Sequence, residues 1–332
     1  MFHSITSRLQ NYVSQCSNLL LAGCLMVDEN FDFITYDNGW NQKQCDKIFE
    51  IGSMTKVYTT TILSQIVLEG KLDLTTPIQD YLPELKVNKT LIDHPCTLRD
   101  LATHNSSLPT LPGSFILKSS LSPKIYKQPY MHFSRDDVII YAKKHHFTGV
   151  QKHKYSNLGI GLLSLIMERV EGKQLDQLMK ERIFSPLRMD STSISTSLDD
   201  KLVTGHTFKG KEVQHWQFNG LEAAGAIRSN IQDQMKFLNA NMHPDTTALK
   251  DSVQLAQKRQ ASGTDKLDFG LGWAINHEDG IIWHNGGTNG FNSIMAFHPQ
   301  KKVGIILLLN YAPPFKETRR IDPIAFDILN GL

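Results

Sequence analysis

The segments that predict β-strands lie at the two ends of this chain, and a long helical stretch separates them. Near the amino end, an apolar run at 19–27 and an alternating run at 31–36 are followed by Asp-Asn-Gly, a common turn sequence. After about residue 265, short apolar runs alternate with turns such as Pro-Gln-Lys-Lys, which favours an antiparallel meander. This order predicts one sheet completed by both ends of the chain, with helices inserted between them.

Helical periodicity is clearest in three stretches. Residues 4–17 predict an amphipathic opening helix, residues 49–70 predict a buried helix that stops at a glycine, and residues 158–172 predict the strongest helix of the middle part. We therefore expect an α+β protein whose antiparallel sheet, formed by both chain ends, is flanked by helices.

The same pattern divides the chain into two parts. We expect a discontinuous sheet domain formed by residues 1–75 and 205–332, and a mostly helical insertion lobe at 76–204. The active site is expected in the cleft between them.

Composition limits the partners. The 35 Lys and Arg residues nearly balance the 33 Asp and Glu residues, so nothing favours nucleic acid, and a small-molecule ester, amide or peptide is the expected partner.

No apolar run approaches the roughly 18 residues that span a bilayer. We expect neither a metal nor another cofactor, since the local histidines at 132–153 have no cysteine or carboxylate to complete a ligand set. The pattern does not predict an oligomeric state.

The four cysteines lie in the first third of the chain, without paired spacing, and are interpreted as reduced thiols. Residues Leu21 to Cys24 spell the lipobox of bacterial lipoproteins, but the segment before them is polar where a signal peptide needs an apolar region. We assign them instead to a buried strand from Leu19 to Val27. A cytoplasmic location is therefore expected.

Ser53 and Lys56 lie at the polar start of the helix predicted at 49–70, three positions apart and on one helix face. A serine hydroxyl becomes a good nucleophile when a base takes its proton, and a lysine can do so once burial lowers its pKa. The helix N-terminus adds N–H groups that can stabilise an oxyanion. The alternative is a solvated helix cap, but this helix is otherwise too apolar for the surface.

Tyr155 and Asn157 come immediately before the strongest predicted helix. A phenol beside a lysine ammonium is favoured as phenolate, so Tyr155 is suited to act as base in acylation and as acid towards the leaving group. Asn157 is suited to hydrogen-bond a substrate amide or to position Lys56. The alternative is that Asn157 merely caps the helix.

Residues 281–287 read Ile-Ile-Trp-His-Asn-Gly-Gly, an apolar strand that ends at His284 and runs into Gly286 and Gly287. Glycines here fit a solvent-facing turn. They equally fit the wall of a catalytic cleft, where a missing side chain lets backbone N–H groups approach a substrate.

Taken in order, Ser-x-x-Lys, Tyr-x-Asn and His-x-Gly make the chain resemble the serine β-lactamase and penicillin-binding protein superfamily, in its class C-like branch. That branch includes class C β-lactamases, D,D-carboxypeptidases, D-aminopeptidases and family VIII carboxylesterases. Similar flanking stretches extend over nearly the whole chain, including Tyr-Leu-Pro-Glu-Leu at 81–85, residues 97–109, residues 154–172 and Gly-Gly-Thr-Asn-Gly-Phe at 286–291.

The resemblance implies a β-lactamase/transpeptidase-like fold and a role for each motif residue. Ser53 would be the acylated nucleophile, Lys56 and Tyr155 the proton-transfer pair, and Asn157 a contact to a substrate amide. Which of Lys56 and Tyr155 is the immediate base stays open.

For the third motif, the resemblance implies that His284 and Gly286 line the cleft, and that the N–H groups of Ser53 and Gly287 form the oxyanion hole. Class C β-lactamases have Lys-Thr-Gly where this chain has His-Asn-Gly, and a mostly neutral imidazole attracts a carboxylate less than an ammonium does. An esterase or D-amino-acid peptidase is therefore expected. The alternatives are a β-lactamase or D,D-carboxypeptidase, an acyltransferase, and a non-catalytic binding or assembly protein.

Overall fold

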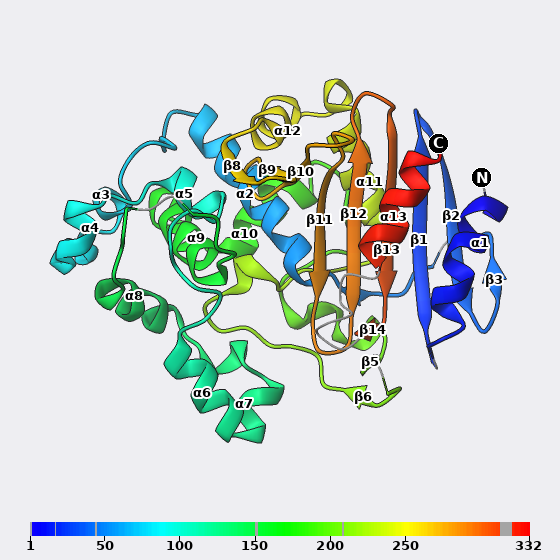
Figure 1. Cartoon of the computed structure of the whole chain (residues 1–332), viewed down its shortest axis with the longest axis horizontal. Coiled ribbons are helices and arrows are strands. Elements are labelled where there is room, and N and C mark those ends of the chain that lie inside the picture. Colours follow the sequence, from blue (N-terminus) through cyan, green and yellow to red (C-terminus); the bar gives the residue numbers. More distant parts are fainter. Residues whose placement is uncertain (1, 17, 44, 150–151, 208, 313–320) are drawn as a thin grey trace.

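A nine-stranded antiparallel sheet organises the molecule, in the strand order β3-β2-β1-β13-β12-β11-β10-β9-β8 (Figure 1). The computed structural model describes residues 2–16, 18–43, 45–149, 152–207, 209–312 and 321–332. The strands of this sheet are β1 (Leu20–Val27), β2 (Asn30–Asp37), β3 (Trp40–Asn41), β8 (Ala261–Thr264), β9 (Leu267–Phe269), β10 (Ala274–Asn276), β11 (Ile282–Gly287), β12 (Asn292–His298) and β13 (Val303–Leu309).

The pairing of β1 with β13 joins the two ends of the chain, with Leu21 opposite Leu309 and Val27 opposite Val303. The predicted α+β arrangement, with one antiparallel sheet made by both ends, is confirmed. Cys24 lies in the middle of β1, where burial raises the pKa of its thiol to about 12. All four cysteines are free.

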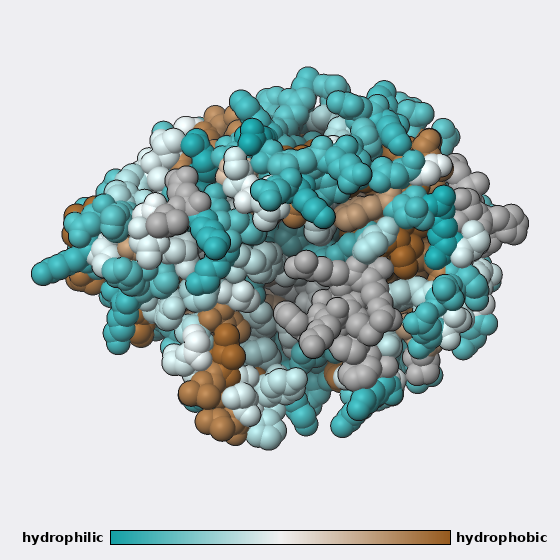
Figure 2. All heavy atoms as spheres, in the orientation of Figure 1, coloured by the Kyte–Doolittle hydropathy of each residue, from teal (hydrophilic) through white to brown (hydrophobic). Residues whose placement is uncertain are grey.

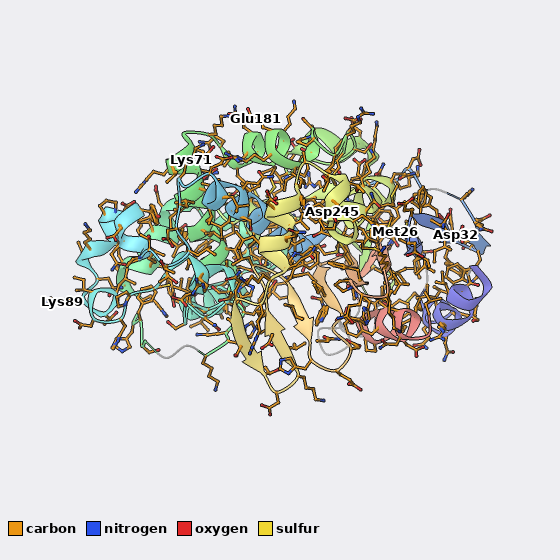
Figure 3. The ribbon with its side chains drawn as sticks, turned by 90° about the horizontal axis from the view of Figure 1, so that it is seen from above. Met26, Asp32, Lys71, Lys89, Glu181 and Asp245 are labelled. Carbon is orange, nitrogen blue, oxygen red and sulfur yellow. The ribbon has the colours of Figure 1, made fainter. Side chains whose placement is uncertain are left out.

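Side chains that alternate along the central strands pack against helices on both faces of the sheet. Leu21 and Leu25 face the cluster of α1 (Phe2–Val13) and α13 (Ile321–Asn330), whereas Met26 belongs to the core on the opposite face. On that opposite face, α11 (Ile231–Met242) contacts β13 and β1. Figure 3 shows α13 and α1 along one side of the sheet, with Met26 labelled on the other. Position 17 of the predicted opening helix lies outside the described residues.

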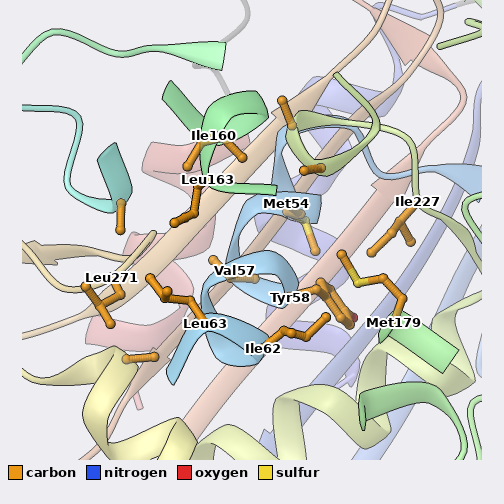
Figure 4. Close-up of a cluster of buried hydrophobic side chains, with 14 of the residues drawn as sticks. Met54, Val57, Tyr58, Ile62, Leu63, Ile160, Leu163, Met179, Ile227 and Leu271 are labelled. Carbon is orange, nitrogen blue, oxygen red and sulfur yellow. The ribbon is translucent and has the colours of Figure 1, made fainter. Parts of the chain in front are cut away.

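Helix α2 (Thr55–Leu68) is surrounded by protein, as its apolar sequence predicts. It packs against α9 (Asn157–Glu171), α10 (Leu175–Met179) and α12 (Lys250–Gln257), and Figure 4 shows its side chains at the centre of the core. The first turn of α2, which includes Lys56, is therefore buried.

The helix predicted at 49–70 starts later than expected. Its first residues form strand β4 (Phe49–Glu50), which pairs with β7 (Arg228–Ser229), followed by a 3-10 turn, η1 (Gly52–Met54). The physical reason is Gly52, whose φ of +52° lies in the left-handed region, outside a right-handed helix.

The first of the short apolar runs expected after about residue 265, at 269–275, is also interrupted. β9 ends at Phe269 and β10 begins at Ala274, because Gly272 has a φ of +74° and a Cβ there would lie 2.6 Å from Oγ1 of Thr60. Strand β11, by contrast, continues beyond His284 to Gly287. The glycines after His284 are therefore part of a strand and not a turn.

Between the sheet segments, the chain is mainly helical. Its short elements are α3 (Ile78–Tyr81), η2 (Pro83–Val87), α4 (Lys89–Asp93), α5 (Leu98–Ala102), α6 (Gly113–Leu121), α7 (Pro123–Lys127), η3 (Tyr130–His132), α8 (Arg135–Lys144), η4 (Lys180–Phe184) and η5 (Thr196–Lys201). Three small strands, β5 (Gly205–Thr207), β6 (Glu212–Val213) and β14 (Tyr311–Ala312), form a second sheet, and η6 (Glu222–Ala224) and η7 (Pro244–Thr246) complete the fold. In the described parts of the chain, every helix is too short or too polar to cross a bilayer.

Candidate active site

The backbone of η1 lies directly against the end of β11. A Cβ added to Gly52 would lie 2.7 Å from the backbone N of Gly287, and one added to Gly286 would lie 1.9 Å from the carbonyl O of Ile51. Real side chains do not tolerate such contacts with backbone atoms. Two glycines thus let the segment that carries Ser53 approach the strand that carries Gly287.

Lys56 is fully buried one helical turn after Ser53. Its Nζ lies 3.1 Å from Oγ of Ser53 and donates to the carbonyl O of Ala224 at 2.7 Å. Burial lowers the pKa of Lys56 well below its ordinary value, because the charged form loses its hydration. The amine next to Ser53 is therefore biased towards its neutral, proton-accepting form, and Ser53 itself remains partly exposed.

The side chain of Tyr155 lies next to both Ser53 and Lys56. Its side chain hydrogen-bonds with Ser53, and Nζ of Lys56 lies 4.8 Å from the centre of its ring. Burial raises the pKa of the Tyr155 phenol, and the hydrogen bond from Ser53 offsets this only in part. The phenolate expected from the sequence is wrong for the free protein, because both Tyr155 and Lys56 are shifted towards their neutral forms.

Asn157 is the first residue of α9, but it does not cap the helix. The cap is Ser156, whose Oγ accepts the N–H of Gly159 at 2.8 Å. Asn157 instead donates from Nδ2 to the hydroxyl of Tyr130 at 2.7 Å, and its buried Oδ1 has no hydrogen-bond partner among the described residues. A buried acceptor without a partner is a candidate contact for a ligand N–H. Its expected contact to Lys56 is not among the hydrogen bonds of the described residues.

His284 lies on β11, with its ring centre 6.4 Å from that of Tyr155. Burial, and secondarily the proximity of Lys56, lowers the pKa of His284 to about 3. Its Nδ1 lies 2.5 Å from the carbonyl O of Asn285 and so carries the proton. At neutral pH the third motif thus presents an uncharged imidazole.

Gly286 and Gly287 have different surroundings. Besides the backbone of Ile51, the missing Cβ of Gly286 faces Oγ of Ser293 at 2.5 Å, whereas a Cβ on Gly287 would meet only the carbonyl O of Phe291, at 3.7 Å. Glycine is therefore sterically required at position 286 but not at position 287. Gly287 remains where an oxyanion donor is expected, beside the segment of Ser53.

Two residues outside the predicted set of catalytic and substrate-binding residues also support the site. One is Tyr130, the buried hydrogen-bond partner of Asn157, for which burial raises the phenol pKa to about 12. The other is His104, which follows α5 with a φ of +60°. Its carbonyl O accepts the N–H of Lys154, and its Nδ1 accepts the N–H of Ser156. The stretch Thr-His-Asn-Ser-Ser-Leu-Pro offered a signal for His104, but nothing in the spacing singled out Tyr130.

Comparison with known proteins identifies the family to which the chain is similar. The family model described as Beta-lactamase matches residues 34–329. A β-lactamase of Escherichia coli K12 is 26% identical over 323 residues, which cover 86% of this chain and 80% of that protein. The D-alanyl-D-alanine-carboxypeptidase/endopeptidase AmpH of the same strain is 29% identical over 289 residues, which cover 81% of this chain and 72% of AmpH.

The fold also has a close match among solved structures. A class C β-lactamase from Rhodobacter sphaeroides superposes with a TM-score of 0.81 and covers 98% of this chain and 99% of its own, at 19% sequence identity. At that identity, the similarity shows the fold alone. The family model matches residues 34–329, which is most of the chain, so the chain belongs to the Beta-lactamase family of serine hydrolases.

Proposed function

We propose that this protein is a serine hydrolase that forms an acyl-enzyme on Ser53 and cleaves esters or D-amino-acid peptides and amides. The observation that carries the proposal is the fully buried amine of Lys56, 3.1 Å from Oγ of Ser53. Because burial favours the neutral amine, Lys56 is the immediate base in this proposal, and Tyr155 acts second.

In the acylation step, Lys56 takes the hydroxyl proton as Oγ of Ser53 bonds to the substrate carbonyl carbon. The N–H groups of Ser53 and Gly287 stabilise the oxyanion. The leaving group departs with the proton of the Tyr155 hydroxyl, which is replaced by a proton from the Lys56 ammonium. Water then attacks the acyl carbon and gives a proton to Tyr155, whose own hydroxyl proton passes to Lys56. The Lys56 ammonium protonates Oγ of Ser53 as the acyl bond breaks, which releases the acid and restores the free enzyme.

The two substrate contacts support the proposed specificity. His284 is uncharged at neutral pH, so the third motif does not offer a cation to a substrate carboxylate. The unpartnered Oδ1 of Asn157 suits an amide N–H of a peptide substrate. An uncharged ester or a D-amino-acid amide therefore fits better than a β-lactam carboxylate.

The second candidate is a D,D-carboxypeptidase or a class C-like β-lactamase, and the similarity to AmpH and to the E. coli β-lactamase favours it. Transfer of the acyl group to an amine or alcohol would use the same residues.

Reaction with a fluorophosphonate probe tests the mechanism, with a Ser53→Ala variant as control. Turnover of p-nitrophenyl butyrate, a D-alanyl peptide and a chromogenic cephalosporin tests the substrate class. We expect probe labelling and ester or peptide turnover that Ser53→Ala abolishes. Equal behaviour of the wild type and Ser53→Ala with every substrate would refute an acyl-enzyme on Ser53, and rapid cephalosporin turnover would refute the proposed specificity.

A further inference from the structure

The α6–α7 hairpin, residues 113–127, exposes an unusual amount of apolar surface. None of its residues is buried. The exposed fractions are 53% for Ile116, 63% for Leu117, 78% for Leu121 and 69% for Tyr126. Figure 2 shows hydrophobic side chains gathered over these two helices. A contiguous apolar patch on a folded protein marks a site of interaction.

The charged residues of the hairpin itself all have the same sign. Lys118, Lys124 and Lys127 lie on the hairpin and are all exposed. The sequence contains no acidic residue between Asp100 and Asp136. Apolar side chains flanked by lysines, with a tyrosine among them, are the composition of helices that lie in the interface of an anionic membrane.

The hairpin is held by contacts at both of its ends. Oγ1 of Thr110, just before α6, donates to the carbonyl O of Tyr155 at 3.0 Å. At the end of α7, the carbonyl O of Lys127 accepts from Nδ2 of Asn289 at 3.1 Å. Since Tyr155 and the segment after Gly287 belong to the candidate site, the exposed hairpin is attached to two walls of that site.

We propose that the α6–α7 hairpin docks on an anionic lipid surface. Ile116, Leu117, Leu121 and Tyr126 enter the boundary between headgroups and acyl chains, and the three lysines contact headgroup phosphates. A second copy of the chain is a poorer occupant, because a two-fold interface through this patch would bring like-charged lysines together. The docking is independent of the reaction at Ser53.

Cosedimentation of the full chain with vesicles tests the proposal. The vesicles are phosphatidylcholine alone or phosphatidylcholine containing phosphatidylglycerol. The test variants are Leu117→Ser with Leu121→Ser, and Lys124→Gln with Lys127→Gln. The matched control is Val87→Ser with Ile92→Ser, which removes apolar side chains that are 69% and 55% exposed elsewhere on the surface.

We expect the wild type and the control to bind vesicles with phosphatidylglycerol, and more weakly at raised salt. The double lysine variant should bind roughly 25-fold more weakly, about fivefold for each lysine, and the double leucine variant should lose binding at least tenfold, with unchanged thermal unfolding. Absence of wild-type binding, or equal binding by the hairpin variants and the control, would overturn the proposal. A wild-type dimer that the leucine variant dissociates, without vesicle binding, would instead identify a subunit interface.

Discussion

The imidazole of His104 packs against the ring of Tyr155, with 4.5 Å between the ring centres, and accepts the N–H of the next residue, Ser156, at 3.2 Å. The carbonyl O of His104 also accepts the N–H of Lys154 at 2.8 Å. One residue thus holds the backbone on both sides of Tyr155. Burial lowers the pKa of His104 well below its ordinary value, so the ring stays neutral and its Nδ1 remains an acceptor.

We expect His104 to be a positioning residue for Tyr155. Asparagine accepts hydrogen bonds and tolerates a positive φ, so His104→Asn should keep most of kcat/KM, whereas His104→Gly should lose roughly tenfold or more, mainly in kcat. Because glycine relieves the backbone strain, the lower activity of His104→Gly would report the missing side-chain acceptor. The rate of fluorophosphonate labelling measures the effect at Ser53. Equal rates for both variants would contradict this role.

The lowered pKa of Lys56 predicts the pH dependence of the reaction. The neutral amine is the active form, so kcat/KM should rise with pH and level off above an apparent pKa well below the ordinary 10.5 of lysine. Lys56→Arg should lose roughly a thousandfold, since a guanidinium does not give up its proton. A His284→Gln variant serves as control, because the pKa of His284 is about 3 and its loss should leave this limb in place.

The same shift makes a prediction about stability. Lys56 titrates near 10.5 when unfolded and lower when folded, so between these values the unfolded state binds more protons and stability rises with pH. The Lys56→Met variant lacks this pH-dependent contribution to stability. We therefore compare the free energies of unfolding of Lys56→Met and the wild type. The value for the variant minus that for the wild type should be largest at neutral pH and should decrease as the pH approaches about 10. Urea unfolding at several pH values measures it, and a constant difference would show that the amine is not shifted.

Gly286 and Gly287 should respond very differently to the same substitution. Gly286→Ala forces a Cβ to within 1.9 Å of the carbonyl O of Ile51, so it should cost about 1–3 kcal/mol of stability and most of the activity. Gly287→Ala has room and should stay within about 0.5 kcal/mol. Thermal unfolding compares the two. Equal losses would mean that β11 and η1 do not approach each other as described.

Replacing the uncharged side chain of the third motif tests its role in specificity. His284→Lys should raise kcat/KM for a cephalosporin carboxylate relative to p-nitrophenyl butyrate by roughly tenfold, because an ammonium attracts the carboxylate. His284→Gln, which stays neutral, should leave this ratio unchanged. Steady-state kinetics on both substrates provides the measurement. A ratio that moves equally in both variants would point to shape and not to charge.

Local patterns predicted the parts of the fold that depend on neighbours along the chain. The strand around Cys24, the buried helix after Ser53 and the helix after Ser156 all follow from apolar periodicity. The exact start of α2 did not, because the left-handed Gly52 and its contact with Gly287 depend on a segment more than two hundred residues away.

In the candidate site, too, some features follow from local sequence spacing and others depend on the packing of distant segments. Ser53 and Lys56 are one helical turn apart, so their proximity is a local property that the spacing indicates. The hydrogen bond between Tyr130 and Asn157, and the contact of His104 with Tyr155, arise only when distant segments pack together. The predicted charge state of Tyr155 was wrong for a related reason: the burial that raises its pKa depends on the whole fold.

The pairing of β1 with β13 also has a consequence for synthesis on the ribosome. Strands β11 to β13 are made long after β1, and until then β1 lacks β13, one of its two partner strands. Contacts so distant in sequence form slowly and late. A nascent chain that still lacks β11 has Ser53 and Lys56 but not the strand that lies against them, so activity should begin only after β11 to β13 have left the exit tunnel.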